Sequence, residues 1–221
     1  MTVTEALKLR KSTRAFLNKS VDIKIIQRVL DAAKHSPSGV NTQPWQVAVV
    51  SGDKKIEIEQ AMENAFNSGV KGKMDYQYYP NEWQEPYKNR RKVCGLQLYS
   101  TLKIAREDKA KQKQQWLANY RAFDAPVVLF FFMDKVMNTG SFLDYGMFLQ
   151  SIMLAAVEED LAICPQAALA EYPQIIKEKL GYSDDCILIC GMAFGYEDQS
   201  AVVNSYRTAR EEVDSFTKFF E

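Results

Sequence analysis

One stretch, residues 142–157, limits the choice of folds more than any other part of this chain of 221 residues. Six apolar residues recur there at the three- and four-residue steps of one helical face: Tyr145, Phe148, Leu149, Ile152, Met153 and Ala156. Five more occupy the other faces: Phe142, Leu143, Met147, Leu154 and Val157. A helix that is apolar nearly all round must be buried on nearly all sides. We therefore expect a core helix over residues 142–160 that also faces a second subunit.

Continuous apolar runs of strand length supply a layer against which such a helix can pack. Pro126–Met133 and Cys186–Phe194 predict two buried strands, and Gln46–Val50 predicts another strand. Cys186 and Cys190 are four residues apart, so on a regular strand they share one face. There we expect both cysteines to act as small core hydrophobes.

Helix signals fill the spaces between these strands. Thr2 and Glu5 have the spacing of a capping box, which predicts a helix over residues 3–10. Asp22 and Asp53 are expected to cap the N-terminal ends of two further helices. Residues 93–122 have a helical and highly charged pattern, and a short helix runs to Leu180 and is closed by Gly181.

Charge and composition exclude several classes of function. Lysine plus arginine number 28 and aspartate plus glutamate number 28, so the formal net charge is zero, which disfavours a nucleic-acid partner. There is no Cys-x-x-Cys pair and only one histidine, His35, so we expect no metal site. The longest apolar run, Ala125–Met133, is too short for a membrane helix, and the N-terminus has no apolar signal region. We expect a cytoplasmic protein with reduced thiols and no membrane partner.

Residues 69–92 form an irregular segment rich in aromatic and basic residues. The aromatic residues are Tyr76, Tyr78, Tyr79, Trp83 and Tyr87, and the basic residues that follow are Lys88, Arg90, Arg91 and Lys92. A nucleic-acid reader mixes bases and aromatics in this way, and so does a loop folded over a pocket. The neutral charge of the whole chain favours the loop.

A basic cluster near the N-terminus is the first candidate binding site. Arg10-Lys11-Ser12-Thr13-Arg14 contains three cations and two hydroxyls within five residues. A guanidinium group matches phosphate oxygens with a fixed fork of donors, and hydroxyls add further donors. A solvated surface would have the same composition, so the cluster alone leaves both interpretations open.

Three blocks of residues occur in a fixed order along the chain. They are Arg10-Lys11-Ser12-Thr13-Arg14-Ala15-Phe16, then Ser36-Pro37-Ser38-Gly39-Val40-Asn41-Thr42-Gln43-Pro44-Trp45, and then the helix at Asp144-Tyr145-Gly146 with Cys164-Pro165-Gln166-Ala167 and Gly191-Met192-Ala193-Phe194-Gly195. In order and spacing the blocks resemble the nitroreductase family of FMN-dependent oxidoreductases. The resemblance covers most of the chain except residues 69–122, a region that varies in the family and covers the substrate pocket.

The resemblance implies an α+β fold in which helices wrap a central, mostly antiparallel sheet, and an interlocked homodimer. It implies a single domain over residues 1–221, with 69–122 as a variable cover of the substrate pocket and 196–221 as a C-terminal arm. The phenylalanines at 216, 219 and 220 follow a polar stretch and need a surface on which to dock. An arm that crosses to the partner would supply that surface.

The resemblance also implies roles for the residues that match its motifs. Arg10 and Ser12 would bind the phosphate and ribityl part of FMN, Lys11 would lend backbone contacts, and Arg14 would lie near the flavin pyrimidine. Arg210 matches a C-terminal phosphate-binding arginine, and Arg207 is the second choice for this position. The cofactor-binding block of the other subunit would contain Pro37, Ser38, Gly39, Asn41 and Gln43. Pro165, Gln166 and Ala167 would run along the opposite flavin edge and offer a backbone N–H near flavin N5. Some relatives carry an acidic residue and a glycine after this proline, where this chain has Gln166, Ala167 and Ala168.

The implied function is an FMN-dependent oxidoreductase that takes hydride from NAD(P)H and reduces nitroaromatic, quinone or related small-molecule acceptors in a ping-pong cycle. Such chemistry needs no catalytic acid–base side chain. No Gly-x-Gly-x-x-Gly fingerprint occurs, so the nicotinamide must bind on the flavin. The alternatives are a flavoenzyme of the same fold that performs dehalogenation or flavin breakdown, a non-catalytic FMN-binding protein, and a nucleic-acid module resting on residues 71–92.

Overall fold

A four-stranded antiparallel sheet forms the centre of the molecule in the computed structural model, which describes residues 1–221. The strands are β1 (Gln46–Ser51), β2 (Val127–Asp134), β3 (Ala162–Gln166) and β4 (Cys186–Gly195), in the spatial order β1-β2-β4-β3. Seven of the eight residues of β2 are buried, as its unbroken apolar run predicts. The expected α+β class with an antiparallel sheet is confirmed.

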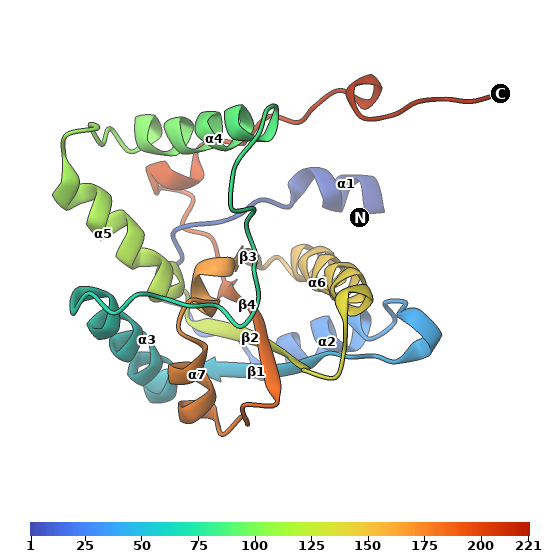
Figure 1. Cartoon of the computed structure of the whole chain (residues 1–221), viewed down its shortest axis with the longest axis horizontal. Helices are drawn as coiled ribbons and strands as arrows, with labels where there is room; N and C mark the ends of the chain where they lie inside the picture. The colour runs from blue at the N-terminus through green and yellow to red at the C-terminus, as the bar shows by residue number, and fades with distance from the viewer.

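Helices cover both faces of this sheet (Figure 1). One face packs against α2 (Ile23–Ala33) and α6 (Thr139–Glu158). The other packs against α3 (Gly52–Asn67), α5 (Lys109–Tyr120) and α7 (Pro173–Leu180). The short helix α1 (Val3–Leu9) lies near α6, and α4 (Tyr87–Thr101) contributes no buried residue to either core.

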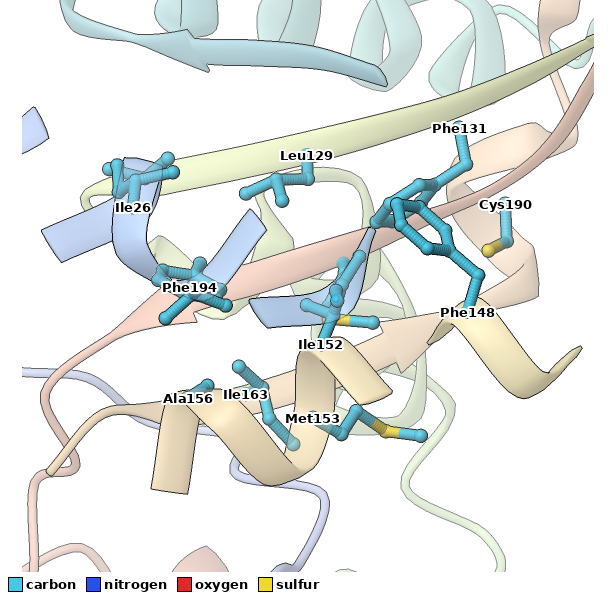
Figure 2. Packing of buried hydrophobic residues seen from close by; sticks show 14 of the residues in the cluster. Ile26, Leu129, Phe131, Phe148, Ile152, Met153, Ala156, Ile163, Cys190 and Phe194 are labelled. Atoms are coloured by element: carbon cyan, nitrogen blue, oxygen red, sulfur yellow. The ribbon is translucent and has the colours of Figure 1, made fainter. Parts of the chain in front are cut away.

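The long apolar helix has the position that its pattern predicts. Figure 2 shows Phe148, Ile152 and Ala156 of α6 among Leu129 of β2 and Phe194 of β4. Leu143, on another face of α6, remains 72% exposed. The chain therefore covers only part of the apolar surface of this helix.

Only α6 has the length and hydropathy of a membrane-spanning helix. The buried core helix of a soluble protein can have the same length and hydropathy. Its packing against the sheet accounts for this composition. The longest continuous apolar run, Ala125–Met133, lies outside α6, so the expectation drawn from that run did not consider this helix. Scattered polar residues interrupt the apolar residues of α6, so it contains no continuous run longer than that one.

The expectation that Cys186 and Cys190 share a face is wrong. Cys186 packs in the core beside α3 and α7, whereas Cys190 packs in the core beside α6. A β-bulge is the cause: Phe131 pairs with Cys190 but Phe132 pairs with Leu188, so Ile189 is an extra residue in β4. One extra residue moves every later side chain to the opposite face of the sheet. Both cysteines are nevertheless buried, as expected.

Most of the predicted helix ends are confirmed. Thr2 and Glu5 form both bonds of a capping box, and the side chain of Asp22 accepts from the N–H of Lys24. Gly181 ends α7 with a left-handed φ of 75°. Asp53 is not a cap, because α3 begins one residue earlier with Ser51 as its N-cap.

The boundaries in the middle of the chain also differ from the expectation. The irregular segment ends at Pro86, and Tyr87 to Lys92 already belong to α4. The expected helical region 93–122 contains parts of two helices, because the chain turns between Leu102 and Asp108 and Asp108 caps α5 through the N–H of Lys111. The polar and charged pattern of this region continues across the break, so it does not reveal the turn.

Candidate functional site

Basic side chains from both ends of the chain surround a cavity of about 480 Å³. Its lining includes six residues of the predicted cofactor site: Arg10, Lys11, Ser12, Arg14, Arg207 and Arg210. Cys94 of α4 and Tyr206 also line this space, so α1, α4 and the C-terminal segment meet there. The structure thus brings together residues that are almost 200 positions apart in the sequence.

The cluster of residues 10–14 is extended because it runs beside the edge strand β3. Arg10 is the C-cap of α1, and the chain then leaves the helix. Ser12 forms a parallel bridge with Ile163, and the N–H of Thr13 donates to the carbonyl of Ile163 at 3.0 Å. Since the two segments run in the same direction, residues 12–14 follow β3 towards Pro165.

Asn204 fixes this extended segment from the other side. Its Oδ1 accepts from the N–H of Arg14 at 2.8 Å, and its Nδ2 donates to the carbonyl of Ala15 at 2.9 Å. Its own carbonyl accepts from Lys11 Nζ at 2.8 Å, and the residue is only 5% exposed. This role could not be predicted from the sequence, because Asn204 is a single amide in a polar tail.

Two of the predicted cations, Lys11 and Arg207, form contacts with other groups of the protein. Lys11 forms an ion pair with Glu197 at 2.6 Å. Arg207 donates to the carbonyls of Leu9 and Arg10 at the end of α1. Both side chains still line the cavity. The charge of Lys11 is paired with Glu197, whereas Arg207 keeps its charge and uses two donors on backbone carbonyls.

Arg10 has the features of a group prepared for an anion. Its Nε is buried and has no hydrogen-bond partner in the protein. Burial lowers the pKa of the Arg10 guanidinium, and the positive charges of Arg210 and Arg207 lower it further. An unpaired buried donor among like charges is unfavourable unless a ligand satisfies it. A phosphate group would supply both the acceptor oxygens and the negative charge, so these residues fit the phosphate of FMN.

A second, mainly apolar cavity of about 270 Å³ adjoins the other predicted flavin segment. Pro165, Gln166 and Ala167 line it together with Tyr76, Tyr78, Phe142, Tyr145, Gly146, Leu149, Ile189 and Cys190. Gln166 is fixed by Nε2, which donates to the backbone carbonyl of Asn119 at 3.1 Å. This geometry ties the segment after Pro165 to the last turn of α5.

Close packing behind this segment requires a glycine. A Cβ added to Gly191 would lie 2.5 Å from Cδ1 of Leu169. Gly191 pairs with Gln166 in the sheet, and Leu169 belongs to the 3₁₀ turn that begins at Ala167. The glycine therefore lets the turn lie directly on β4, which fixes the backbone at Gln166 and Ala167.

Cys164 lies next to this segment without being a reactive group. It is 3% exposed, and burial raises the pKa of its thiol to about 11 despite the nearby charges of Arg14 and Arg10. A thiol that stays protonated at neutral pH is a poor nucleophile. Its role is to pack in the core.

The aromatic segment before α4 is firmly attached at its beginning. Asp75 forms a buried ion pair with Lys177 at 2.8 Å and accepts from the N–H of Leu188 at 2.9 Å. The hydroxyl of Tyr76 donates to the carbonyl of Ile189 at 2.7 Å. These contacts hold Tyr76 at the apolar cavity.

The remaining predicted residues lie elsewhere in the subunit. Pro37, Ser38, Gly39, Asn41 and Gln43 belong to an exposed loop around a 3₁₀ turn, Gly39–Asn41, and line neither cavity. The N–H of Gly39 donates to Asp144 in the N-terminal half of α6. Ser12 instead bridges Ile163 of β3, which follows the C-terminal end of α6 in the chain.

This loop is also strained. Val40, Asn41 and Gln43 have φ values of 46°, 60° and 47°, and Val40 is 98% exposed. A left-handed backbone is uncommon for residues other than glycine and is a genuine outlier for a β-branched residue. Such strain is typical of binding loops.

Comparison with known proteins finds similar proteins over nearly the whole chain. A family model described as the nitroreductase family matches residues 7–196. A chloronitrobenzene nitroreductase of Comamonas testosteroni is 34% identical over 98% of this chain and 96% of its own length.

Two solved structures are similar over nearly their whole length. The FMN- and NADPH-dependent nitroreductase NfnB of Sphigopyxis sp. strain HMH is 38% identical, covers 100% of both chains and has a TM-score of 0.97. The FMN-dependent nitroreductase NfnB of Mycobacterium smegmatis, solved in complex with NADPH, is 31% identical, covers 99% of this chain and 97% of that one, and has a TM-score of 0.94.

Proposed function

Because this chain belongs to the nitroreductase family, we propose that it is an FMN-dependent enzyme that uses NAD(P)H to reduce nitroaromatic compounds, quinones or related acceptors. The observation that carries this function is the cationic cavity with the unpaired Arg10. The segment that lines this cavity runs beside β3, and Pro165 and Gln166 of β3 line an apolar, aromatic cavity. A phosphate site and an apolar site on neighbouring segments suit a phosphorylated planar cofactor and a planar acceptor.

The phosphate end of FMN would lie among Arg10, Ser12 and Arg210. These three side chains line the cavity, and none of them forms an ion pair. Lys11 and Arg207 would support this arrangement through their contacts with Glu197 and with the end of α1. Arg14, further along the same segment, would lie near the flavin pyrimidine.

FMN would supply the hydride chemistry through its N5 atom. The protein would contribute a positive field from Arg14, which stabilises negative charge on a reduced flavin. Pro165, Gln166 and Ala167 would set the flavin edge, since Gly191 and Asn119 hold that backbone in place. Tyr76, Tyr78 and Phe142 would exclude water and stack on a planar acceptor.

We propose a homodimer in which both subunits form each flavin site. Pro37, Ser38, Gly39, Asn41 and Gln43 lie away from the cationic cavity in one subunit, so they would reach the flavin of the partner. Three uncovered apolar surfaces support this proposal: Leu143 on α6, Val40 in the strained loop, and the phenylalanines at 216, 219 and 220, which are 70%, 78% and 89% exposed. The C-terminal segment extends away from the body of the subunit, as an arm to a partner would (Figure 1).

We propose that residues 1–221 form one domain. Residues 69–122 would cover the substrate pocket, and residues 196–221 would form the arm. All four cysteines are free, which suits a reducing cytoplasm.

The test uses the colour of the purified protein and its response to reductant. The protein should be yellow with bound FMN, NADPH or NADH should bleach it under anaerobic conditions, and a nitroaromatic or quinone should restore the colour with turnover. Bleaching without reoxidation by any acceptor would identify a flavin carrier instead of this enzyme. A colourless protein that does not take up added FMN would overturn the proposal.

A further inference from the structure

A chain of aromatic rings leads from the apolar cavity to the surface of α4. Phe142 and Tyr76 have ring centroids 4.9 Å apart, and Tyr76 and Tyr78 follow at 6.2 Å. The step from Tyr78 to Tyr79 is 4.6 Å, and the step from Tyr79 to Trp83 is 5.6 Å. We call these five residues the aromatic ladder. Its inner end lines the cavity beside Pro165, and its outer end lies at α4.

The ladder ends at a positive charge. The guanidinium carbon of Arg91 lies 5.3 Å from the centroid of the Trp83 ring. Arg91 is exposed and forms no ion pair, whereas its neighbour Arg90 is paired with Glu211 at 3.1 Å. A cation on an indole ring keeps its outward donors free for another ligand.

Two more cations lie close to Arg91 on α4. Lys88 is three residues before Arg91 and four residues before Lys92, so its side chain neighbours both of them on the helix surface. Neither lysine forms an ion pair, and α4 contains no acidic residue over Tyr87–Thr101. In a chain of zero net charge, three unpaired cations beside exposed rings form a local site for an anion attached to an aromatic group.

Cys94 shows how α4 lies relative to the cationic cavity. It lies one helical turn after Arg91 and lines the cationic cavity around Arg10. Gln97, a turn further, donates to the carbonyl of Arg207 at 3.1 Å. The outer cations therefore lie on the helix that borders the proposed flavin phosphate, but outside that phosphate site.

We propose that Arg91, with Lys88 and Lys92, binds the 2′-phosphate of NADPH, and that Trp83 and Tyr79 stack on its adenine. This inference rests on the proposed function: in a ping-pong cycle the nicotinamide would occupy, before the acceptor does, the apolar cavity at the inner end of the ladder. A ribose phosphate carries a negative charge near −2 and accepts charge-assisted hydrogen bonds from a guanidinium fork. NADH lacks this phosphate, so the site makes the enzyme prefer NADPH.

The decisive variant is Arg91→Ala, measured with both reductants at fixed ionic strength. Loss of a charge-assisted contact raises the KM for NADPH by about ten- to a hundredfold. The KM for NADH stays unchanged, and Arg91→Lys recovers part of the loss. Trp83→Ala raises the KM values for both NADPH and NADH, because both molecules contain the adenine that would stack on Trp83. Arg106→Ala removes an exposed arginine between α4 and α5 that forms no ion pair, and it leaves both KM values as in the wild type.

A binding measurement complements the kinetics. Adenosine 2′,5′-bisphosphate titrated into the FMN-loaded protein, followed by calorimetry, binds the wild type more tightly than AMP does, and Arg91→Ala abolishes the difference. Retained FMN and NADH-driven turnover in Arg91→Ala show that the proposed function stands whatever happens to this site. The inference is overturned if the wild type has equal KM values for NADPH and NADH. It is also overturned if Arg91→Ala raises the KM values for NADPH and NADH equally, or changes neither.

Discussion

At the scale of single residues, the site depends on polar groups whose partners come from distant parts of the chain. Asn204 holds the backbone at Arg14 and Ala15, and Asn119 holds the side chain of Gln166. Neither amide can be identified from local sequence, because each is defined only by the segment that folds against it. Arg10 was identifiable, since its basic neighbours and its place in a family motif are local features.

The first prediction concerns Arg10. Arg10→Ala should remain folded but lose FMN on gel filtration, because a charge-assisted contact contributes roughly 1.5–3 kcal/mol, or about one to two decades of affinity. Arg28→Ala is a suitable control, since Arg28 pairs with Glu159 at 2.6 Å on the surface, away from both cavities. If Arg10→Ala holds FMN as tightly as the wild type does, Arg10 is not a phosphate ligand.

The second prediction concerns the pH dependence of stability. Glu59 of α3 is 8% exposed and lies 2.5 Å from Lys55. Burial raises the pKa of Glu59 to about 7, more than Lys55 lowers it. The unfolded chain, with an ordinary pKa of 4.5, therefore ionises first as the pH rises. Glu59 thus contributes stability below that value, and this contribution is lost as the pH rises towards 7.

Urea unfolding of the wild type and Glu59→Gln at several pH values measures this effect. The wild type should lose stability relative to the variant between about pH 4.5 and 7, with a slope of at most about 1.4 kcal/mol per pH unit. Glu57 on the same helix has its pKa held down to about 2 by Lys179 and then Lys54, so the profiles of Glu57→Gln and the wild type should run parallel above about pH 4.5 and converge only in acid, where Glu57 becomes protonated. Parallel profiles for the wild type and Glu59→Gln would show that Lys55 keeps Glu59 ionised throughout.

At the scale of elements, the segment before α4, which is the first part of the proposed cover of the substrate pocket, has two different halves. Residues 70–76 are attached to the sheet and to α7 by buried contacts, including Asp75 to Lys177 and Tyr76 to Ile189. Residues 77–86 are mostly exposed and make few hydrogen bonds beyond their own segment. A segment with little buried surface opens at a low free energy.

The third prediction follows from this difference. Amide hydrogen exchange, read by mass spectrometry, should be fast over residues 77–86 and slow over 70–76. Asp75→Asn should speed exchange over 70–76, since Lys177 and the N–H of Leu188 would lose a charged partner. Uniformly slow exchange over 70–86 would mean that the cover is rigid and that acceptors enter by another route.

At the scale of the whole molecule, the positions of the two groups of proposed cofactor-binding residues matter most. The fourth prediction is that each flavin site needs two subunits, so complementary inactive variants should restore each other. Arg10→Ala/Arg14→Ala disables one half of a site, and Ser38→Ala/Asn41→Ala disables the other. A mixed dimer would carry one site with both defects and one intact site, and should regain half of the FMN. An interface of this kind commonly buries more than about 2,000 Å².

Refolded mixtures can be purified with two different affinity tags and their FMN content measured by absorbance. Each variant refolded alone, in the same tagged form, gives the background. Mixed dimers with no more FMN than either parent would place both halves of the site in one subunit.

The whole fold was easier to predict than its details. The apolar runs of β2 and β4 and the pattern of α6 identify the core, because burial selects the same residue types along an entire element. The bulge at Ile189 is invisible for the same reason: an extra apolar residue in an apolar run leaves no mark in composition. The assignment of Ser38 and Asn41 to a partner site came from the family motif, and their distance from the cavity could not be read from the sequence.

The crowding of Arg10, Arg207 and Arg210 has a consequence for the protein before it receives its cofactor. Like charges held together in a partly buried space repel one another, so the cofactor-free form carries an internal strain that any small dianion relieves. Inorganic phosphate or sulfate in a buffer would raise the melting temperature of that form and at the same time compete with incoming FMN. The choice of buffer during purification would then decide how much flavin the protein retains, and a nearly colourless preparation in phosphate could regain its colour after dialysis into a phosphate-free buffer containing FMN.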